Sequence, residues 1–299
     1  MLLKCSGWAC MRLISVSKAR GGNPVAVNDP EHFAIEFMIC EDCGDNFCDL
    51  CHAPGTRFRA PRCASCGGRL APGKRLEQLS GRPRPPAVEH LRRGVELVES
   101  ERPEDALAEL GEAIRLRPEY AAAHYWRGGA LVQLDRGAEA VDAFENALRH
   151  NPSNVDALYE KAGAFARMER IEDAIDAYDR TIALQPGFPA AHLNRAVLVL
   201  DQDRDAEALA AADHVLALLT AGRTRGGSTY DAASAHSIKG AALVKLGRFA
   251  EALPFIDYAI DNGLDSWNDY YNKAYALDRL GRTEEADLAR GISDSLREA

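Results

Sequence analysis

The sequence has no cysteine beyond residue 66, few aromatic residues and no long apolar runs. All eight cysteines of the 299-residue chain lie at or before residue 66, and aromatic residues make up 7% of it. No stretch is long and apolar enough to cross a membrane. The first residues, MLLKCSGWACMRLISV, have no continuous apolar run before a small-residue cleavage site, which is not the pattern of a signal peptide. We therefore predict a cytoplasmic protein that does not enter a membrane.

Short catalytic motifs are absent as well. The chain contains no G-x-x-x-x-G-K-[ST], no G-x-S-x-G and no H-E-x-x-H. These are the patterns of phosphate-binding loops, hydrolase nucleophiles and zinc proteases. The aspartates and glutamates are scattered along helical stretches instead of forming one constellation. We predict no catalytic residues and a protein that is not an enzyme.

Basic residues are scarce in the larger part of the chain. Residues 1–86 carry 12 Lys and Arg against 8 Asp and Glu, whereas residues 87–299 carry 24 against 37. Contacts with nucleic-acid phosphates need clustered Lys and Arg. We therefore do not expect the acidic part to bind nucleic acid, and a basic protein partner would suit it better.

What the chain does have is a period of 34 residues. Within residues 121–154, small residues stand at Gly128 and Ala140, a large one at Phe144 and a proline at Pro152. Small residues let two helices approach closely, and large ones fill the space between them. Proline ends the second helix because it lacks a backbone donor and restricts the residue before it. The same places recur 34 residues earlier and later, at Gly94, Ala106, Leu110 and Pro118, and at Ala162, Ala174, Tyr178 and Pro186.

This pattern resembles the tetratricopeptide repeat (TPR). The resemblance implies a mainly α fold, a TPR α-solenoid of about six helix-turn-helix repeats. We place the repeats at 87–120, 121–154, 155–188, 189–232, 233–266 and 267–299.

Two repeats depart from the regular pattern. The spacing from Ala208 to Ala252 is 44, so ten residues are inserted, and we place them in a loop from Leu219 to Asp231. The second helix of the last repeat carries polar residues, as a solvent-facing terminal cap should. These residues are Asp287, Arg290, Ser293 and Asp294.

In TPR proteins the first helix of each repeat lines a concave groove that binds a protein segment. By this resemblance, the partner-binding residues are Leu91, Tyr125, Gly129, Tyr159, Gly163, Leu193, Val197, Tyr271 and Tyr275. The edge of the groove would be formed by Val132, Gln133, Arg167, Lys245 and Arg279. Tyrosine suits peptide recognition because it is large, amphipathic and has few rotors. The alternative is that these rings are core, since an aromatic stripe at helical spacing is also typical of a buried face.

Some TPR proteins grip a C-terminal carboxylate with a Lys and an Asn one turn apart. Leu91 and Val95 occupy those places in the first repeat. The sequence therefore does not predict that clamp.

Four histidines recur at one place of four repeats: His90, His124, His192 and His236. Histidines in register could hold a metal, but each belongs to a different repeat, so they should be stacked apart instead of converging on one ion. We interpret them as residues that pack between helices.

The eight cysteines form four close pairs, three of which are C-x-x-C. Two thiolates at that spacing can face one ion, and four pairs supply ligands for two closed tetrahedral zinc sites. The predicted zinc ligands are Cys5, Cys10, Cys40, Cys43, Cys48, Cys51, Cys63 and Cys66. Two structural Zn²⁺ ions would leave no open coordination position for catalysis. Cys48 to His52 also spells the haem attachment motif C-x-x-C-H, which is the alternative.

The core CEDCGDNFCDLC resembles the middle of a FYVE or related cross-brace finger, in which adjacent pairs serve different metals. The resemblance implies that Cys5, Cys10, Cys48 and Cys51 hold one zinc and that Cys40, Cys43, Cys63 and Cys66 hold the other. FYVE domains carry basic residues before the cysteine, where this chain has Phe37, Met38 and Ile39. The resemblance therefore does not extend to phosphoinositide binding.

The organisation predicted is a small zinc-stabilised β-rich module at 1–70, a Pro/Arg/Gly-rich linker at 71–86 and the TPR array at 87–299. Apolar residues alternate from Phe33 to Ile39, which predicts a strand, and residues 11–17 are a candidate partner strand. We predict an adaptor or scaffold that binds a protein segment. The alternatives are a RING-like ubiquitin-transfer component, with the array choosing substrates, and nucleic-acid binding by the zinc module and basic linker.

Overall fold

The computed structural model describes the backbone of six short strands before residue 73 and of residues 86–222, 229–263 and 266–298. Within residues 86–222, 229–263 and 266–298, side chains are described at all positions except 229 and 230. The chain divides into two compact units, Met1–Ala164 and Phe165–Ala299, and each is described by itself.

The six strands form two three-stranded sheets. In the first, β2 (Leu13–Ser15) pairs antiparallel with β1 (Leu2–Lys4) and parallel with β3 (Phe33–Ala34), with Ile14 opposite Leu3 and Ala34. In the second, β4 (Phe37–Cys40) pairs antiparallel with β5 (Asn46–Cys48) and β6 (Leu70–Pro72), with Met38 opposite Phe47 and Pro72. The alternating stretch predicted as one strand thus contributes to two, because β3 and β4 pair in different sheets. Its predicted partner, residues 11–17, supplies β2.

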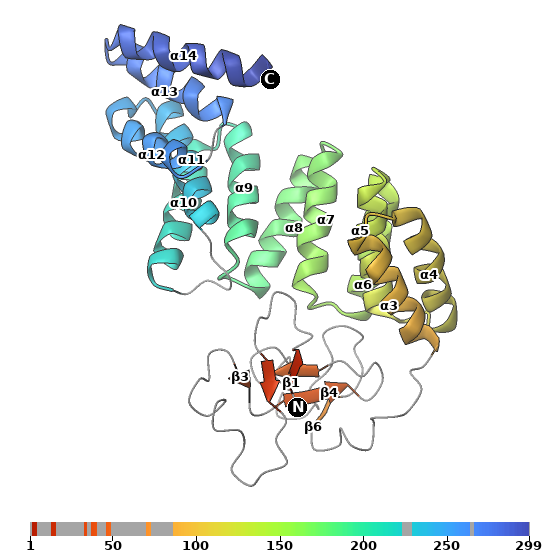
Figure 1. Ribbon diagram of the computed structural model, residues 1–299. Helices are drawn as coiled ribbons and strands as arrows, with labels where there is room; N and C mark the ends of the chain where they lie inside the picture. Colours follow the sequence, from red (N-terminus) through yellow and green to blue (C-terminus); the bar gives the residue numbers. More distant parts are fainter. Residues whose placement is uncertain are drawn as a thin grey trace. The chain divides into compact units, whose positions relative to one another are not determined.

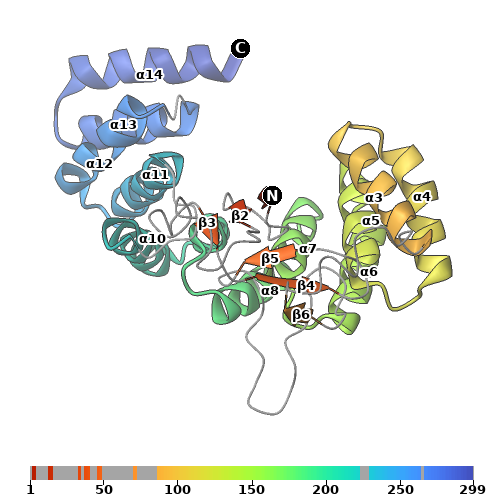
Figure 2. The same ribbon diagram turned by 60° about the horizontal axis from the view of Figure 1, so that its bottom comes forward.

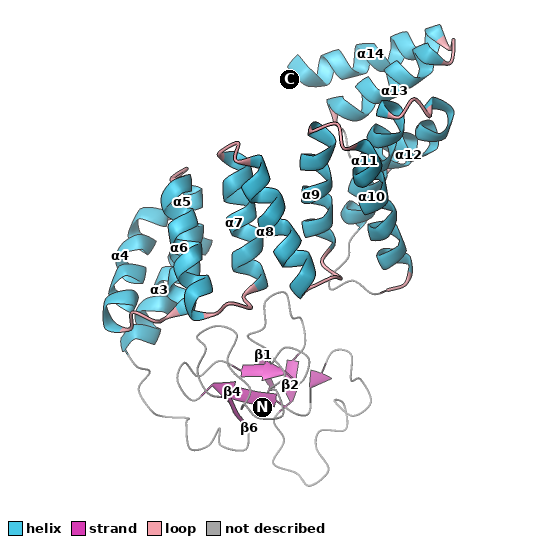
Figure 3. Cartoon of the chain, turned by 180° about the vertical axis from the view of Figure 1, so that it is seen from behind, coloured by secondary structure: helices cyan, strands magenta, loops and turns pink. Residues whose placement is uncertain are grey.

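From residue 86 on, the described residues form twelve helices and no strand (Figure 3). They are α3 (Pro86–Glu99), α4 (Pro103–Leu116), α5 (Ala121–Gln133), α6 (Gly137–His150), α7 (Val155–Arg167), α8 (Ile171–Leu184), α9 (Pro189–Asp201), α10 (Asp205–Thr220), α11 (Thr229–Lys245), α12 (Phe249–Asp261), α13 (Trp267–Arg279) and α14 (Thr283–Glu298). Consecutive helices pack in pairs, such as α3 with α4 and α13 with α14 (Figures 1 and 2). Two helices per predicted repeat confirm the helical solenoid.

Three of the helix pairs are held at close range by a glycine facing a large side chain. A Cβ added at Gly128 would lie 2.5 Å from the Phe144 ring, and one at Gly240 would lie 2.5 Å from Ile256 Cγ1. Phe144 and Ile256 are fully buried. Glycine in a helix interior costs about 1 kcal/mol relative to alanine. Here it is favoured because no larger residue fits the space that the partner helix fills.

The turn between the two helices has the same form in all six repeats. One residue of each turn has a positive φ: Glu101 (56°), Asp135 (55°), Glu169 (57°), Asp203 (57°), Gly247 (76°) and Gly281 (75°). An arginine always follows and pairs with a carboxylate three residues later, as in Arg136–Glu139 at 2.7 Å and Arg282–Glu285 at 2.6 Å. This carboxylate lies in the first turn of the second helix, where negative charge is stabilised by the helix dipole.

The second helix of the sixth repeat, α14, is more polar than the second helices of the earlier repeats at two places. Two places of the earlier second helices carry apolar residues packed against the cores, such as Leu209 and Leu216 in α10 or Leu253 and Ile260 in α12. In α14 both places are aspartate, at 287 and 294, and both side chains are exposed. The predicted terminal cap is confirmed at these two residues.

Arg290 of α14 is likewise exposed. The prediction is wrong for Ser293, which is buried, because its hydroxyl donates to the backbone carbonyl of Trp267 at 2.9 Å.

The inserted residues of the fourth repeat do not all form a loop. Helix α10 continues to Thr220 and α11 already begins at Thr229. Most of the inserted length therefore extends these two helices beyond those of the regular repeats, and the predicted loop from Leu219 to Asp231 is too long. No helix among the described residues is long and apolar enough to cross a membrane.

Candidate partner-binding face

The fifth, ninth and thirteenth residues of each repeat lie on one side of its first helix, because a spacing of four returns to the same face. We call these residues the first-helix face. In chain order they are Leu91, Val95 and Glu99; Tyr125, Gly129 and Gln133; Tyr159, Gly163 and Arg167; Leu193, Val197 and Asp201; Ser237, Ala241 and Lys245; and Tyr271, Tyr275 and Arg279.

In the first unit the predicted groove residues on this face are partly or fully buried. Leu91 belongs to the core, so the prediction of a groove position is wrong there. The Tyr125 ring packs against Phe144 with centroids 5.9 Å apart and against Trp126 at 5.5 Å. Burial raises the pKa of the Tyr125 phenol, and the charges of nearby Glu160 and Asp156 act in the same direction. The other predicted groove residues of the first unit are half-buried: Gly129, Tyr159 and Gly163.

In the second unit the face opens to solvent at three predicted positions. Tyr271 is 55% exposed, and Tyr275 and Val197 are each 43% exposed. Leu193 is buried in the same core cluster as Ile238 of α11, so here too the predicted groove position is a core residue. The aromatic surface available to a partner is therefore concentrated on α13.

In the fifth repeat, the first-helix face carries Ser237 at the place where the other repeats have leucine or tyrosine. Its hydroxyl donates to the Asp269 carboxylate of α13 at 2.6 Å. Asp269 is buried, which raises the pKa of this carboxyl group against the opposing hydrogen bond from Ser237. Four earlier repeats have a buried alanine at the place of Asp269: Ala123, Ala157, Ala191 and Ala235. Only the last pair of first helices, α11 and α13, is thus joined by a polar contact at this place.

Two of the predicted edge residues have a role within the array. Gln133 Nε2 donates to the carbonyl of Val98 at 3.2 Å, and Lys245 Nζ donates to the carbonyl of Leu200 at 2.6 Å. Each carbonyl is at the end of the preceding first helix, where backbone acceptors lack helical partners. These two residues therefore cap a neighbouring helix, and their polar groups are already engaged.

Histidines in register act as packing residues, as predicted. His124 Nε2 lies 2.8 Å from the carbonyl of Pro118, and His192 Nε2 lies 2.9 Å from that of Pro186. A carbonyl only accepts, so the proton is on Nε2. Both rings pack against a histidine of the second helix: His124 stacks on His150, and His192 meets His214 at a tilt of 54°. Burial lowers the pKa of His124 and of His192.

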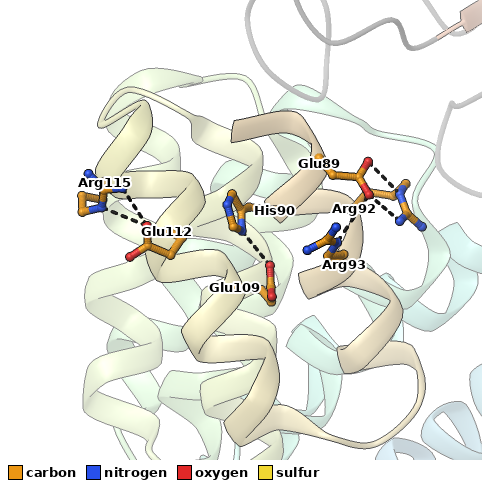
Figure 4. Close-up of polar contacts among 7 residues, drawn as sticks. All are labelled: Glu89, His90, Arg92, Arg93, Glu109, Glu112 and Arg115. Carbon is orange, nitrogen blue, oxygen red and sulfur yellow. Dashed lines mark hydrogen bonds and ion pairs between the residues drawn. The ribbon is translucent and has the colours of Figure 1, made fainter. Parts of the chain in front are cut away.

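The first repeat shows a different histidine contact. His90 Nδ1 lies 2.7 Å from the carboxylate of Glu109, which joins α3 to α4 (Figure 4). Beside it, Arg92 and Arg93 both pair with Glu89. These are contacts between neighbouring helices and within one helix, and they do not form a catalytic constellation.

A recurring ion pair that we did not predict links successive repeats. The seventh residue of a repeat lies on its first helix and is a cation, and it pairs with an acid on the second helix of the repeat before. The pairs are Lys161–Glu145 (2.8 Å), Arg195–Asp179 (2.5 Å), Lys239–Asp213 (2.6 Å) and Lys273–Asp257 (2.7 Å). We call them the repeat-linking pairs. Opposite charges at fixed places of the period were the signal in the sequence. Arg127 has no such partner, since Gly111 occupies the place of the acid.

The zinc prediction lies almost wholly outside the described residues. Only Cys40 and Cys48 fall on described backbone, at the ends of β4 and β5, and their side chains are not described. Within the described part, no three His, Cys, Asp or Glu side chains come together in a group that could hold a metal. The two zinc ions and their ligands stay a prediction.

Paired helices that recur with a period of 34 residues define a helical-repeat protein. The tetratricopeptide repeat family model matches residues 91–144, 130–187, 164–219 and 239–292, which is more than half of the chain. The chain belongs to the tetratricopeptide repeat family, whose members are generally non-enzymatic adaptors. No curated protein matches the sequence.

Solved structures of TPR proteins share the fold at low sequence identity. PilF of Pseudomonas aeruginosa is 16% identical with a TM-score of 0.56, over 68% of this chain and 88% of PilF. The matching chain of the Cut9–Hcn1 hetero-tetramer of the APC/C is 15% identical with a TM-score of 0.57. The match covers 70% of this chain and 40% of that chain. YrrB, described as a TPR protein with an unusual peptide-binding site, is 15% identical with a TM-score of 0.51. The match covers 63% of this chain and 92% of YrrB. At these identities the likeness establishes the fold alone.

Proposed function

We propose that this protein is a cytoplasmic, non-enzymatic adaptor that binds a segment of a partner protein on its first-helix face. The observation that carries the proposal is the pair of tyrosines on α13, 55% and 43% exposed and one helical turn apart. Large aromatic residues left in solvent on one helix face are typical anchors of protein interfaces. The peptide-binding site named for YrrB supports the same use of the fold.

We expect Tyr271→Ala and Tyr275→Ala each to weaken partner binding by roughly five- to tenfold, because truncation removes apolar contact area at an anchor. The full-length protein is used as bait, captured partners are identified by mass spectrometry, and their affinity for each variant is measured. Leu288→Ala is the matched control. This leucine is 70% exposed but lies on α14, outside the first-helix face. Equal losses for Leu288→Ala, or none for either tyrosine, would show that partners use another surface.

The cysteine module is proposed to hold two structural zinc ions. The support is the four close cysteine pairs, at the spacing that closed zinc sites use. Protein purified without added metal should contain about two zinc ions per chain by elemental analysis, and Cys48→Ser with Cys51→Ser should remove about one. A zinc content near zero, or a haem absorption band, would contradict the proposal.

A further inference from the structure

The C-terminal end of α13 carries an exposed cation beside aromatic rings. The guanidinium carbon of Arg279 lies 5.4 Å from the centroid of the Phe249 ring. The Tyr275 ring meets the same Phe249 ring edge-on, with centroids 5.9 Å apart. Arg279, Tyr275 and Tyr271 are spaced four residues apart on α13, so they form one stripe with Phe249 beneath its end.

Arg279 differs from the cations around it because it forms no ion pair with any residue that the structure describes. Its neighbours are engaged: Arg282 pairs with Glu285, and Lys273 pairs with Asp257. The adjacent acid, Asp278, pairs with Arg290. The charge of Arg279 is therefore not neutralised by the described part of its own chain.

Arg279 also departs from the residues at the same place of earlier repeats. Gln133 and Lys245 donate to the end of the preceding first helix. At the matching position Arg279 makes no such bond among the described residues and lies over Phe249 instead. A planar guanidinium held on an aromatic face keeps its N–H edge free for an acceptor.

We infer that Arg279 binds the side-chain carboxylate of an Asp or Glu in the partner segment, while an apolar residue of that segment packs on Tyr271 and Tyr275. This inference rests on the proposed function and adds the chemistry of the partner. A guanidinium matches a carboxylate in a two-pronged geometry. A single cation suits the one charge of an acidic side chain, whereas phosphate is usually bound by several cations.

The spacing of the stripe sets the spacing in the partner. Tyr271 and Arg279 are eight residues apart, which is about 12 Å along a helix at 1.5 Å per residue. An extended chain covers about 3.3 Å per residue. The apolar residue and the acid should therefore be about two to four positions apart, depending on which tyrosine the apolar residue meets.

The test uses a phage-displayed library of random seven-residue peptides selected on the full-length protein. Selected peptides should carry an apolar residue and an Asp or Glu at this spacing. One such peptide, synthesised with an amidated C-terminus, should bind Arg279→Gln roughly tenfold more weakly than the unmodified protein. Replacing its acid with the matching amide should cause a similar loss on the unmodified protein and little further loss on Arg279→Gln.

Arg297→Gln is the matched control, because Arg297 also lies 5.4 Å from an aromatic ring, that of Trp267 on α13, but belongs to α14. This variant should bind the peptide normally. Selected peptides without acids, equal losses for both arginine variants, or binding that requires a free C-terminus would overturn the inference. If Tyr271→Ala abolishes binding while Arg279→Gln does not, the inference fails alone. If no peptide is selected, or peptides bind Tyr271→Ala and Tyr275→Ala normally, the proposed function fails with it.

Discussion

Replacing Phe144 with alanine is expected to lower the free energy of unfolding by roughly 3–5 kcal/mol. The ring is fully buried between α5 and α6 and belongs to a core cluster with Leu131 and Ala140. It fills the space left by Gly128, where an added Cβ would meet ring atoms at 2.5–2.8 Å. Removing the ring leaves a cavity that a glycine on the facing helix cannot fill. Chemical denaturation followed by helical circular dichroism measures the change.

Tyr271→Ala is the control for this experiment. The tyrosine is more than half exposed, so truncating it leaves no closed cavity and should cost less than about 1 kcal/mol. Tyr125→Ala should fall between the two, because its ring packs against Phe144 from a half-buried position. If Phe144→Ala and Tyr271→Ala unfold at the same denaturant concentration, the assignment of core and surface is wrong.

The second large effect is expected at Gly128. Alanine at this position should destabilise the protein by about 1–3 kcal/mol, because its Cβ would press on the Phe144 ring in a packed core. Alanine at the next residue, Gly129, should do the opposite. No atom lies within 4 Å of a Cβ there, so the variant should gain about 1 kcal/mol from helix propensity alone.

Two neighbouring glycines of one helix thus give opposite signs for the same substitution. Thermal and chemical unfolding of both variants measures the sign of each change in stability. Phe144→Leu combined with Gly128→Ala should cost less than the two changes added together, since a shorter side chain relieves the contact. Equal effects at Gly128 and Gly129 would show that the close approach of α5 and α6 does not govern these positions.

The helical fold from residue 86 on could be predicted because the 34-residue period of small and large residues determines how the helices pair. Positions such as Gly128 and Phe144 have the same role in the first, second and fifth repeats, set by the distance between paired helices. Exposure on the first-helix face could not be predicted in the same way. It depends on the side chains of the neighbouring repeat, so Leu91 and Leu193 fold into the core while Tyr271 does not.

The polar residues show a similar limit. The sequence predicts that Ser293 is a surface residue, but its side chain is buried. Burial is tolerated because its hydroxyl donates a hydrogen bond to the backbone carbonyl of Trp267. We predicted Arg279 at the groove edge together with Lys245. Only their contacts show that Lys245 caps a neighbouring helix, whereas Arg279 lies over Phe249 and forms no ion pair with a described residue. The repeat-linking pairs could have been found from sequence, since their charges recur at fixed places.

The repeat-linking pairs make the inner repeats interchangeable. Every linking cation is on a first helix and every linking acid is on a second helix, so the end of any repeat from the second to the fifth matches the beginning of any repeat from the third to the sixth. A gene duplication or deletion of one repeat from the third to the fifth would keep this match of charge at the new junction. The acid's place holds glycine in the first and the sixth repeat, at Gly111 and Gly291, so these two second helices lack the linking acid. Charge thus marks the repeats that can be exchanged without changing the ion pair at their junction.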